Sequence, residues 1–116
     1  MTETDCLFCR IASGEADADI VLENDRVLAF RDINPQAPTH VLIIPRKHVP
    51  TLNDLSGQDV DDIGAMLLAA AEVAKQDGVA EDGYRVAMNC NTLAGQSVFH
   101  VHLHLLGGRR MDWPPG

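Results

Sequence analysis

Two kinds of hydrophobic spacing follow each other along the chain and predict both strands and helices. Segments in which apolar and polar residues alternate, or in which apolar β-branched residues run together, are typical of strands. Five such segments are predicted: 20–23, 26–31, 41–44, 84–89 and 98–106. Asn24-Asp25 between the first two favours a hairpin. The stretch 32–38 must be a loop, because its prolines lack an amide donor.

A second pattern, with apolar residues three and four positions apart, predicts a long helix over about 57–76. Ser56, followed three residues later by Asp59, forms a capping pair for its first turn, and Gly78 follows its end. The positions expected to face a core are Val60, Ile63, Met66, Leu67, Ala70, Val73 and Ala74. A short helix is expected over 7–13.

These elements predict an α+β fold, a five-stranded antiparallel sheet with one long and one short helix on one side of it. Strands that are not joined by repeated helical crossovers favour antiparallel pairing. With 116 residues, of which 46% are hydrophobic and 22% charged, the chain is expected to fold as a single domain over 1–116. A chain of this size buries enough surface on folding for one core but little more, so a metal ion or a second subunit would help to stabilise it.

The charge balance narrows the possible partners. Nine basic against seventeen acidic residues give a net charge of −8, which argues against binding along a nucleic acid. The basic pairs Arg46-Lys47 and Arg109-Arg110 still allow a small phosphate ligand. No apolar run approaches the ~18 residues of a membrane helix, and the start at 1–5 is polar, so we expect a cytoplasmic protein that does not bind membranes. Three cysteines do not make a disulfide framework, which leaves Cys6 and Cys9 as thiols or metal ligands.

The strongest chemical signal is the alternation of His100, His102 and His104 with apolar residues. On a strand, alternate side chains project to one face, so the imidazoles would form a row at a spacing of ~6.5 to 7 Å. Neutral imidazole is a good nucleophile near pH 7 when one nitrogen is free and the other holds its proton against an acceptor. His102 is the predicted nucleophile, because as the middle residue it has possible acceptors for its ring proton on both sides. His104 is the predicted donor to a phosphate oxygen. A metal-binding strand or a polar solvent face is the alternative.

Two further groups of residues add to this signal. Gly95-Gln96-Ser97 offers close backbone approach and a hydroxyl that can donate to a leaving group, and Asn89 offers an amide; each is equally compatible with turn chemistry. Cys6-Leu7-Phe8-Cys9 has the spacing of a zinc knuckle, which needs two more ligands. Two thiols without a metal would give the same pattern.

Together these residues resemble the histidine triad (HIT) family, whose motif is His-φ-His-φ-His-φ-φ with φ apolar. Residues 100–106 match this motif at every position. Within the family the chain is most similar to the Hint branch, the purine nucleoside phosphoramidases. The resemblance covers nearly the whole chain and includes residues 32–40, 95–97, 106–109 and 113–116. The chain departs from the branch at Asp112, where a histidine is common.

The resemblance implies a homodimer formed by pairing the two sheets and helices, and a site for a purine nucleotide of the AMP or GMP type. It implies that Asp32 binds the ribose hydroxyls and that His102 displaces an amine from the phosphate, after which water releases the nucleotide. The residues implied to contact the nucleotide are Leu7, Phe8, Ile11, Phe30, Asp32, Ile33, Asn89, Gln96, Ser97, His102 and His104. Without the resemblance, Asp32 is equally compatible with a turn cap, and Phe30 and Ile33 with core positions.

The resemblance also implies a structural Zn²⁺ site. It adds His48 and His100 to Cys6 and Cys9 as ligands, which removes His100 from acid–base chemistry. His40 is then expected to act with the catalytic residues by orienting the triad. A polar residue at the start of a strand would give the same pattern.

Three other functions stay open. A diadenosine polyphosphate hydrolase or nucleotidyl transferase belongs to the same superfamily, although the transferase branch typically carries glutamine in place of the last histidine, here His104. A non-catalytic nucleotide-sensing or scaffold protein would bind nucleotide without turnover. A catalytic metalloprotein would bind its metal through His102 and His104.

Overall fold

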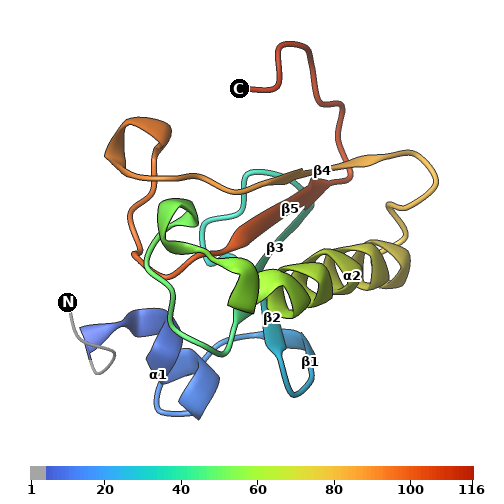
Figure 1. Cartoon of the computed structure of the whole chain (residues 1–116). Coiled ribbons are helices and arrows are strands. Elements are labelled where there is room, and N and C mark those ends of the chain that lie inside the picture. Colours follow the sequence, from blue (N-terminus) through green and yellow to red (C-terminus); the bar gives the residue numbers. More distant parts are fainter. Residues whose placement is uncertain (1–4) are drawn as a thin grey trace.

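The computed structural model describes residues 5–116, which form two α-helices and five strands (Figure 1). The helices are α1 (Leu7–Ser13) and α2 (Val60–Gln76), and the strands are β1 (Ile20–Glu23), β2 (Val27–Arg31), β3 (Thr39–Pro45), β4 (Tyr84–Ala87) and β5 (Leu103–Gly107). Residues 1–4, which make up most of the polar start at 1–5, lie outside the described part of the chain.

The strands form one antiparallel sheet in the order β1-β2-β3-β5-β4, which confirms the predicted fold class. The predicted hairpin joins β1 and β2. At its turn, Oδ1 of Asn24 accepts from the main-chain N–H groups of Arg26 (2.9 Å) and Val27 (3.0 Å). β4 lies at the edge of the sheet beside β5.

The last strand is shorter than its hydrophobic pattern indicated. β5 begins at Leu103, because the preceding residues bend and the N–H of Val101 bonds to the carbonyl of Val49 (2.8 Å), which is not in a strand. His100 and His102 therefore precede the regular strand. Among the other strands, β2 begins one residue later and β4 ends two residues earlier than predicted, and β3 extends further at both ends.

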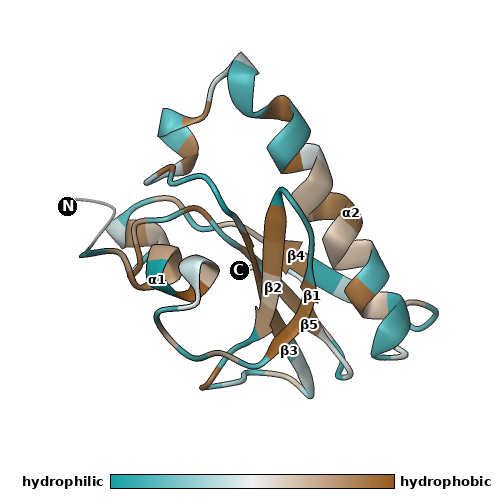
Figure 2. Ribbon diagram, turned by 90° about the horizontal axis from the view of Figure 1, so that it is seen from below, coloured by the Kyte–Doolittle hydropathy of each residue, from teal (hydrophilic) through white to brown (hydrophobic). Residues whose placement is uncertain are grey.

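The two helices cover opposite faces of the sheet, which corrects the expectation that both lie on one side (Figure 2). Every residue of β3 is buried, and so are the first four residues of β2, so both faces of these central strands need cover. α2 packs on the face that carries Val27, Ala29, Val41, Ile43, Leu103 and Leu105. α1 packs on the face that carries Leu28, Phe30, Leu42 and Ile44.

The capping pair predicted for the long helix is present. Ser56 and Asp59 form reciprocal bonds around a 3-10 turn, and the α-helix begins at the next residue. Its buried residues are Met66, Ala69, Ala70, Val73 and Ala74. Two positions predicted to face the core are exposed, Val60 at 65% and Leu67 at 50%, because they lie outside the arc of the helix that the sheet can contact; Leu68, beside them, is 74% exposed. No helix within residues 5–116 is long and apolar enough to span a membrane.

Candidate active site and metal cluster

The triad histidines alternate with core residues as the pattern predicted. Leu103 and Leu105 pack in the core under α2, whereas His104 pairs with Leu42, which belongs to the core on the α1 side. The ring centroids of His102 and His104 are 5.0 Å apart. This is closer than the ~6.5 to 7 Å expected between alternate residues of a straight strand.

His102 has a fixed tautomer. Its Nδ1 lies 2.9 Å from the main-chain oxygen of His100, and since a carbonyl oxygen only accepts, Nδ1 carries the hydrogen. In a neutral ring this leaves the lone pair on Nε2. Burial lowers the pKa of His102 below its ordinary value of 6.5, which keeps the ring neutral near pH 7. His102 therefore has the two properties that a nucleophilic imidazole needs.

A chain of hydrogen bonds sets the opposite tautomer on His104. The main-chain N–H of Gln36 donates to Nδ1 of His40 (3.0 Å), so a neutral His40 ring carries its hydrogen on Nε2. This Nε2 lies 3.0 Å from Nδ1 of His104, which must accept, and the hydrogen of His104 is then on its own Nε2. Burial lowers the pKa of His104 to about 4 and also lowers the pKa of His40, so both rings are neutral near pH 7.

Asp32 adjoins this chain of bonds. Its Oδ2 is 3.4 Å from Nε2 of His40, and its Oδ1 accepts from the main-chain N–H of Asn34 (2.8 Å), as a turn cap does. Ligand atoms of Asp32, His40 and His104 lie close enough together to hold a cation. However, the hydrogen that Gln36 forces onto Nε2 of His40 occupies the position of the metal-binding lone pair. The arrangement therefore favours a hydrogen-bond chain over a metal site.

The residues expected to enclose a purine are divided between the interior and the surface. Phe8, Ile11 and Phe30 are buried in one cluster, Leu7 is partly exposed on α1, and Ile33 is fully exposed on the loop after β2. The ring of Phe8 stands edge-on to His102, with the centroids 5.1 Å apart, and also contacts Phe30 at 5.4 Å. Phe8 thus links this buried cluster to the middle histidine.

Gln96 braces the loop before the histidines. The side-chain amide of this buried residue donates to the carbonyls of Pro50 (2.8 Å) and Val98 (3.1 Å), and its oxygen accepts from the N–H of Asn91 (2.7 Å). Both amide hydrogens are therefore used within the protein. The two other residues expected near the phosphate are Ser97, which is exposed, and Asn89, which is half-buried after β4.

Cys6, Cys9, His48 and His100 converge from three separate parts of the chain. Their ligand atoms all lie within 4.8 Å of one another. The sulfur–nitrogen distances are 3.3 Å (Cys9–His48), 3.4 Å (Cys6–His100) and 3.5 Å (Cys9–His100), and the two Nδ1 atoms are 3.3 Å apart. Tetrahedral zinc, with bonds of ~2.3 Å to sulfur and ~2.0 to 2.1 Å to nitrogen, requires ligand separations of roughly 3.3 to 3.8 Å. The donor set and its spacing therefore fit zinc.

Local structure explains why these residues meet. Cys6 is the N-cap of α1, and its Sγ accepts from the main-chain N–H of Cys9 (3.4 Å). His48 follows β3, and His100 precedes β5, the strand that pairs with β3. Nε2 of His100 donates to the carbonyl of Pro45 (2.7 Å), which leaves the lone pair on Nδ1 available to a metal.

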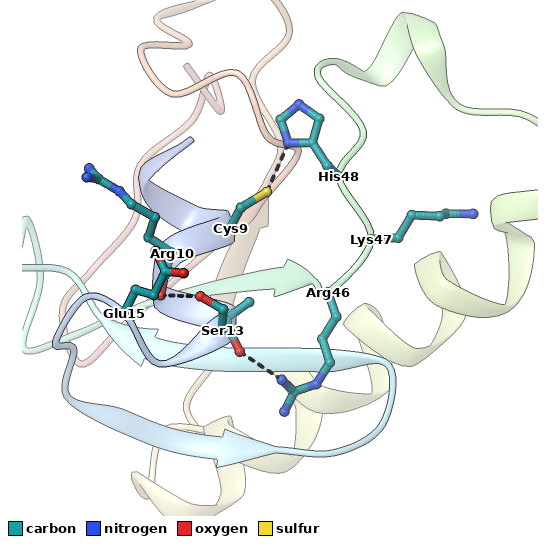
Figure 3. A pocket seen from close by; sticks show the side chains of 8 residues that line it. Cys9, Arg10, Ser13, Glu15, Arg46, Lys47 and His48 are labelled. Atoms are coloured by element: carbon teal, nitrogen blue, oxygen red, sulfur yellow. Dashed lines mark hydrogen bonds between the residues drawn. The ribbon is translucent and has the colours of Figure 1, made fainter. Parts of the chain in front are cut away.

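A cleft of about 460 Å³ opens beside this cluster (Figure 3). Cys9 and His48 line it, and so does Arg46, whose guanidinium donates to the carbonyl of Ala12 (3.2 Å). The lining includes neither the middle nor the last histidine of the triad. This cleft therefore borders the metal cluster and is separate from the two histidines that offer nucleophile and donor.

Sequence reasoning missed three main-chain groups that hold the site together. They are the N–H of Gln36 and the carbonyls of Pro45 and Val49. Every residue carries such groups, so no side-chain pattern marks them. The only signal was the irregular, proline-containing character of the loops in which Gln36 and Val49 lie.

The chain is similar to known proteins over nearly its whole length. The family model of the HIT domain matches residues 13–111. The chain is 53% identical over 103 residues to the purine nucleoside phosphoramidase of Escherichia coli (strain K12), which covers 89% of this chain and 87% of that protein. It is 47% identical over 118 residues to the 14 kDa zinc-binding protein of Zea mays, which covers 100% of this chain and 91% of that protein. The crystal structure of a HIT family hydrolase from Legionella pneumophila Philadelphia 1 matches with a TM-score of 0.94 and 54% identity over 97% of this chain and 100% of that chain.

The antiparallel sheet, the row of histidines and the Cys/His cluster define a hydrolase of the histidine triad class. The chain belongs to the HIT family. A relative that is named as zinc-binding agrees with the fit of the cluster to zinc.

Proposed function

We propose that the protein hydrolyses the P–N bond of purine nucleoside 5′-phosphoramidates, such as AMP linked to an amine or to lysine, through a nucleotide bound covalently to His102. The observation that carries this proposal is the bond from Nδ1 of His102 to the carbonyl of His100, since it leaves a free lone pair on Nε2 of a neutral ring. The E. coli relative, named as a purine nucleoside phosphoramidase, supports the substrate class.

The reaction has two displacement steps. Nε2 of His102 attacks phosphorus and forms an N–P bond, while the P–N bond to the amine breaks. The amine leaves with a proton that comes from solvent, either directly or through the Ser97 hydroxyl, which gives one proton and takes up another. The Nε2–H of His104 donates to a phosphoryl oxygen as negative charge develops there. Water then attacks the phosphorus and loses a proton to solvent, an O–P bond replaces the N–P bond, and the nucleoside monophosphate is released together with a neutral His102 whose Nε2 lone pair is free again.

Nucleotide recognition is proposed to use both polar and apolar neighbours of His102. The carboxylate of Asp32 accepts from the ribose hydroxyls in charge-assisted hydrogen bonds. The residues proposed to enclose the purine are Phe8, Ile11 and Phe30 from the buried cluster, with Leu7 and Ile33 at its edge. Asn89 and the Gln96-Ser97 main chain are proposed to face the phosphate.

Cys6, Cys9, His48 and His100 would hold a structural zinc ion. Four protein ligands complete a tetrahedral zinc site and leave no open position for water. The ion would stabilise the attachment of α1 to the strands.

A side-by-side assay tests this function against the alternatives. The protein is expected to hydrolyse AMP-amine substrates faster than diadenosine polyphosphates. His102→Ala is expected to lower kcat by about 10⁴- to 10⁶-fold while AMP binding persists, and His104→Ala to lower kcat by about 10²- to 10⁴-fold. Faster cleavage of diadenosine polyphosphates would favour that hydrolase, and AMP binding without any turnover would favour a sensing protein. Activity that persists in His102→Ala would reject the mechanism.

We also propose that two copies associate through the β4 edge and the outer surface of α2. β4 ends the sheet, and Leu67 and Leu68 expose apolar surface on α2. Next to them is an apolar groove of about 150 Å³, lined by Leu52, Leu55, Ile63, Met66, Leu67, Met88 and Leu103. A two-fold axis would place each of these surfaces against its own copy, which pairs the strand edges and buries the leucines.

A further inference from the structure

The segment that carries the proposed nucleophile is anchored outside the sheet. Regular pairing of β5 begins only after His102. Before it, the N–H of Val101 bonds to the carbonyl of Val49, which is the residue next to His48 in the metal cluster. The second anchor is the fully buried side chain of His100, itself a member of the cluster. The segment is therefore attached at two points, one next to His48 and one at His100, and both of these residues belong to the metal cluster.

His100 connects the metal cluster to the nucleophile through two of its own groups. Its Nδ1 points at the donor atoms of the cluster, and its Nε2 is held by the carbonyl of Pro45. Its main-chain oxygen accepts the Nδ1–H of His102 at 2.9 Å. Because the ring is held at both nitrogens, the cluster restrains the backbone oxygen that sets the tautomer of His102.

The cysteine knuckle also places Phe8 against the nucleophile. Phe8 lies between the two cysteines and is buried. Its ring is perpendicular to that of His102 (88°, 5.1 Å between centroids) and also contacts His100 (6.0 Å). α1 has only seven residues, too few for a helix to persist by itself, so Phe8 depends on the attachment of α1 for its position.

We propose that the Cys6, Cys9, His48 and His100 cluster positions the nucleophile, in addition to stabilising the fold. Removal of the metal leaves four electron-rich atoms pointing at one another, so they separate and the main-chain oxygen of His100 shifts. The Nδ1–H bond of His102 then weakens, and the ring populates the tautomer with its hydrogen on Nε2, which cannot attack phosphorus. The effect on catalysis rests on the proposed function, whereas the effect on the tautomer can be measured without any substrate.

The first test is ¹⁵N NMR of the His102 ring in the full-length protein. Spectra are recorded with zinc bound, after removal of zinc with a chelator, and after zinc is added back. We expect hydrogen on Nδ1 in the zinc-bound protein, a mixture of tautomers in the folded metal-free protein, and recovery when zinc returns. An unchanged tautomer in the folded metal-free protein would overturn the proposal, whether or not the enzyme assay succeeds.

The second test measures turnover of an AMP-amine by the same samples. Loss of zinc is expected to lower kcat by about 10- to 100-fold, which is the size of effect seen when a residue that orients a metal ligand is replaced. The affinity for AMP is expected to be unchanged. Val73→Ala is the matched control, because it opens a cavity under α2 on the opposite face of the sheet. While folded, this variant is expected to keep the kcat and the tautomer of the wild type. An equal loss of kcat in the folded control would show that the effect is one of general stability and would overturn positioning.

Two further outcomes are distinguished by these samples. If the zinc-bound wild type fails to turn over any AMP-amine, the proposed function fails, and the NMR result still decides whether the cluster sets the tautomer. If the metal-free protein unfolds, Cys9→Ser at saturating zinc replaces it, because this variant keeps three ligands. A folded Cys9→Ser protein with the wild-type tautomer and kcat would overturn the proposal.

Discussion

At the scale of single residues, two histidines of the site have opposite tautomers and therefore different chemical roles. Nε2 of His102 offers a lone pair, and Nε2 of His104 offers a hydrogen. The difference comes from the opposite nitrogen, which donates to a main-chain carbonyl in one ring and accepts from His40 in the other. Burial lowers the pKa of both rings, so each stays neutral and keeps its tautomer.

Replacing His40 tests whether this tautomer of His104 matters. His40→Leu removes the donor to Nδ1 of His104, so kcat is expected to fall by about 10- to 100-fold with little change in nucleotide affinity. His40→Gln keeps an amide donor near the position of Nε2 and is expected to retain more activity. The readout is the separate effect on kcat and KM of the two variants, and wild-type kcat in folded His40→Leu would contradict the role of this bond.

Several side chains of the site could be predicted from the sequence, but their hydrogen-bonded states could not. The alternation of His100, His102 and His104 marks one face of a segment whatever the rest of the fold. Cys6 and Cys9 indicate a knuckle by spacing, whereas their partners came only from resemblance to a family. The tautomers depend on main-chain atoms brought close by folding, and these leave no pattern in the sequence.

At the scale of elements, every strand and both α-helices could be predicted from the sequence, but not the face of the sheet that each helix covers. The apolar residues 27–30 and 41–44 form continuous runs, which is the pattern of strands buried on both faces. Helices on opposite sides of the sheet could therefore have been predicted from that pattern. The apolar stripe of α2 was predicted too wide, since a helix lying on a sheet buries only one arc and leaves Val60 and Leu67 exposed.

An ion pair joins three of these elements and gives stability a dependence on pH. Arg31 at the end of β2 donates to both carboxylate oxygens of Asp77, which follows α2, and Thr39 of β3 donates to the same carboxylate. The Arg31 hydrogen bond is the main reason that the pKa of Asp77 lies below its ordinary value of 3.8. Because the folded pKa is the lower one, the stabilisation is fully present well above pH 3.8 and is lost as the pH falls through the folded pKa.

Asp77→Asn is therefore expected to lower the free energy of unfolding by about 1 to 2 kcal/mol at pH 7, a modest value because Arg31 is partly exposed. Urea denaturation of the wild type and the variant at several pH values measures the difference. It should stay constant from pH 7 to pH 5 and shrink below pH 3.8. A difference that is independent of pH in the acid range would contradict this account of the ion pair.

At the scale of the whole molecule, the main question is how the exposed apolar surface of α2 is covered. Light scattering is expected to give the mass of two chains for the wild type and about 12.6 kDa for Leu68→Glu, because the new charge would be buried in the interface. Ile20→Glu is the control, since Ile20 is also exposed but lies on β1 at the opposite edge of the sheet. A wild type that stays monomeric at all concentrations, or a dimeric Leu68→Glu, would contradict the proposed interface.

The proposed mechanism requires Nε2 of His102 to be the atom that binds phosphorus, and mass spectrometry of the trapped intermediate measures this directly. The protein is mixed with an AMP-amine, quenched in denaturant under conditions that preserve N–P bonds, and digested. One adenylyl group is expected on the peptide that contains the triad, located on His102 by fragmentation and missing from His102→Ala. An adenylyl group on His104 or Ser97, or full turnover with no group on any histidine, would contradict this mechanism.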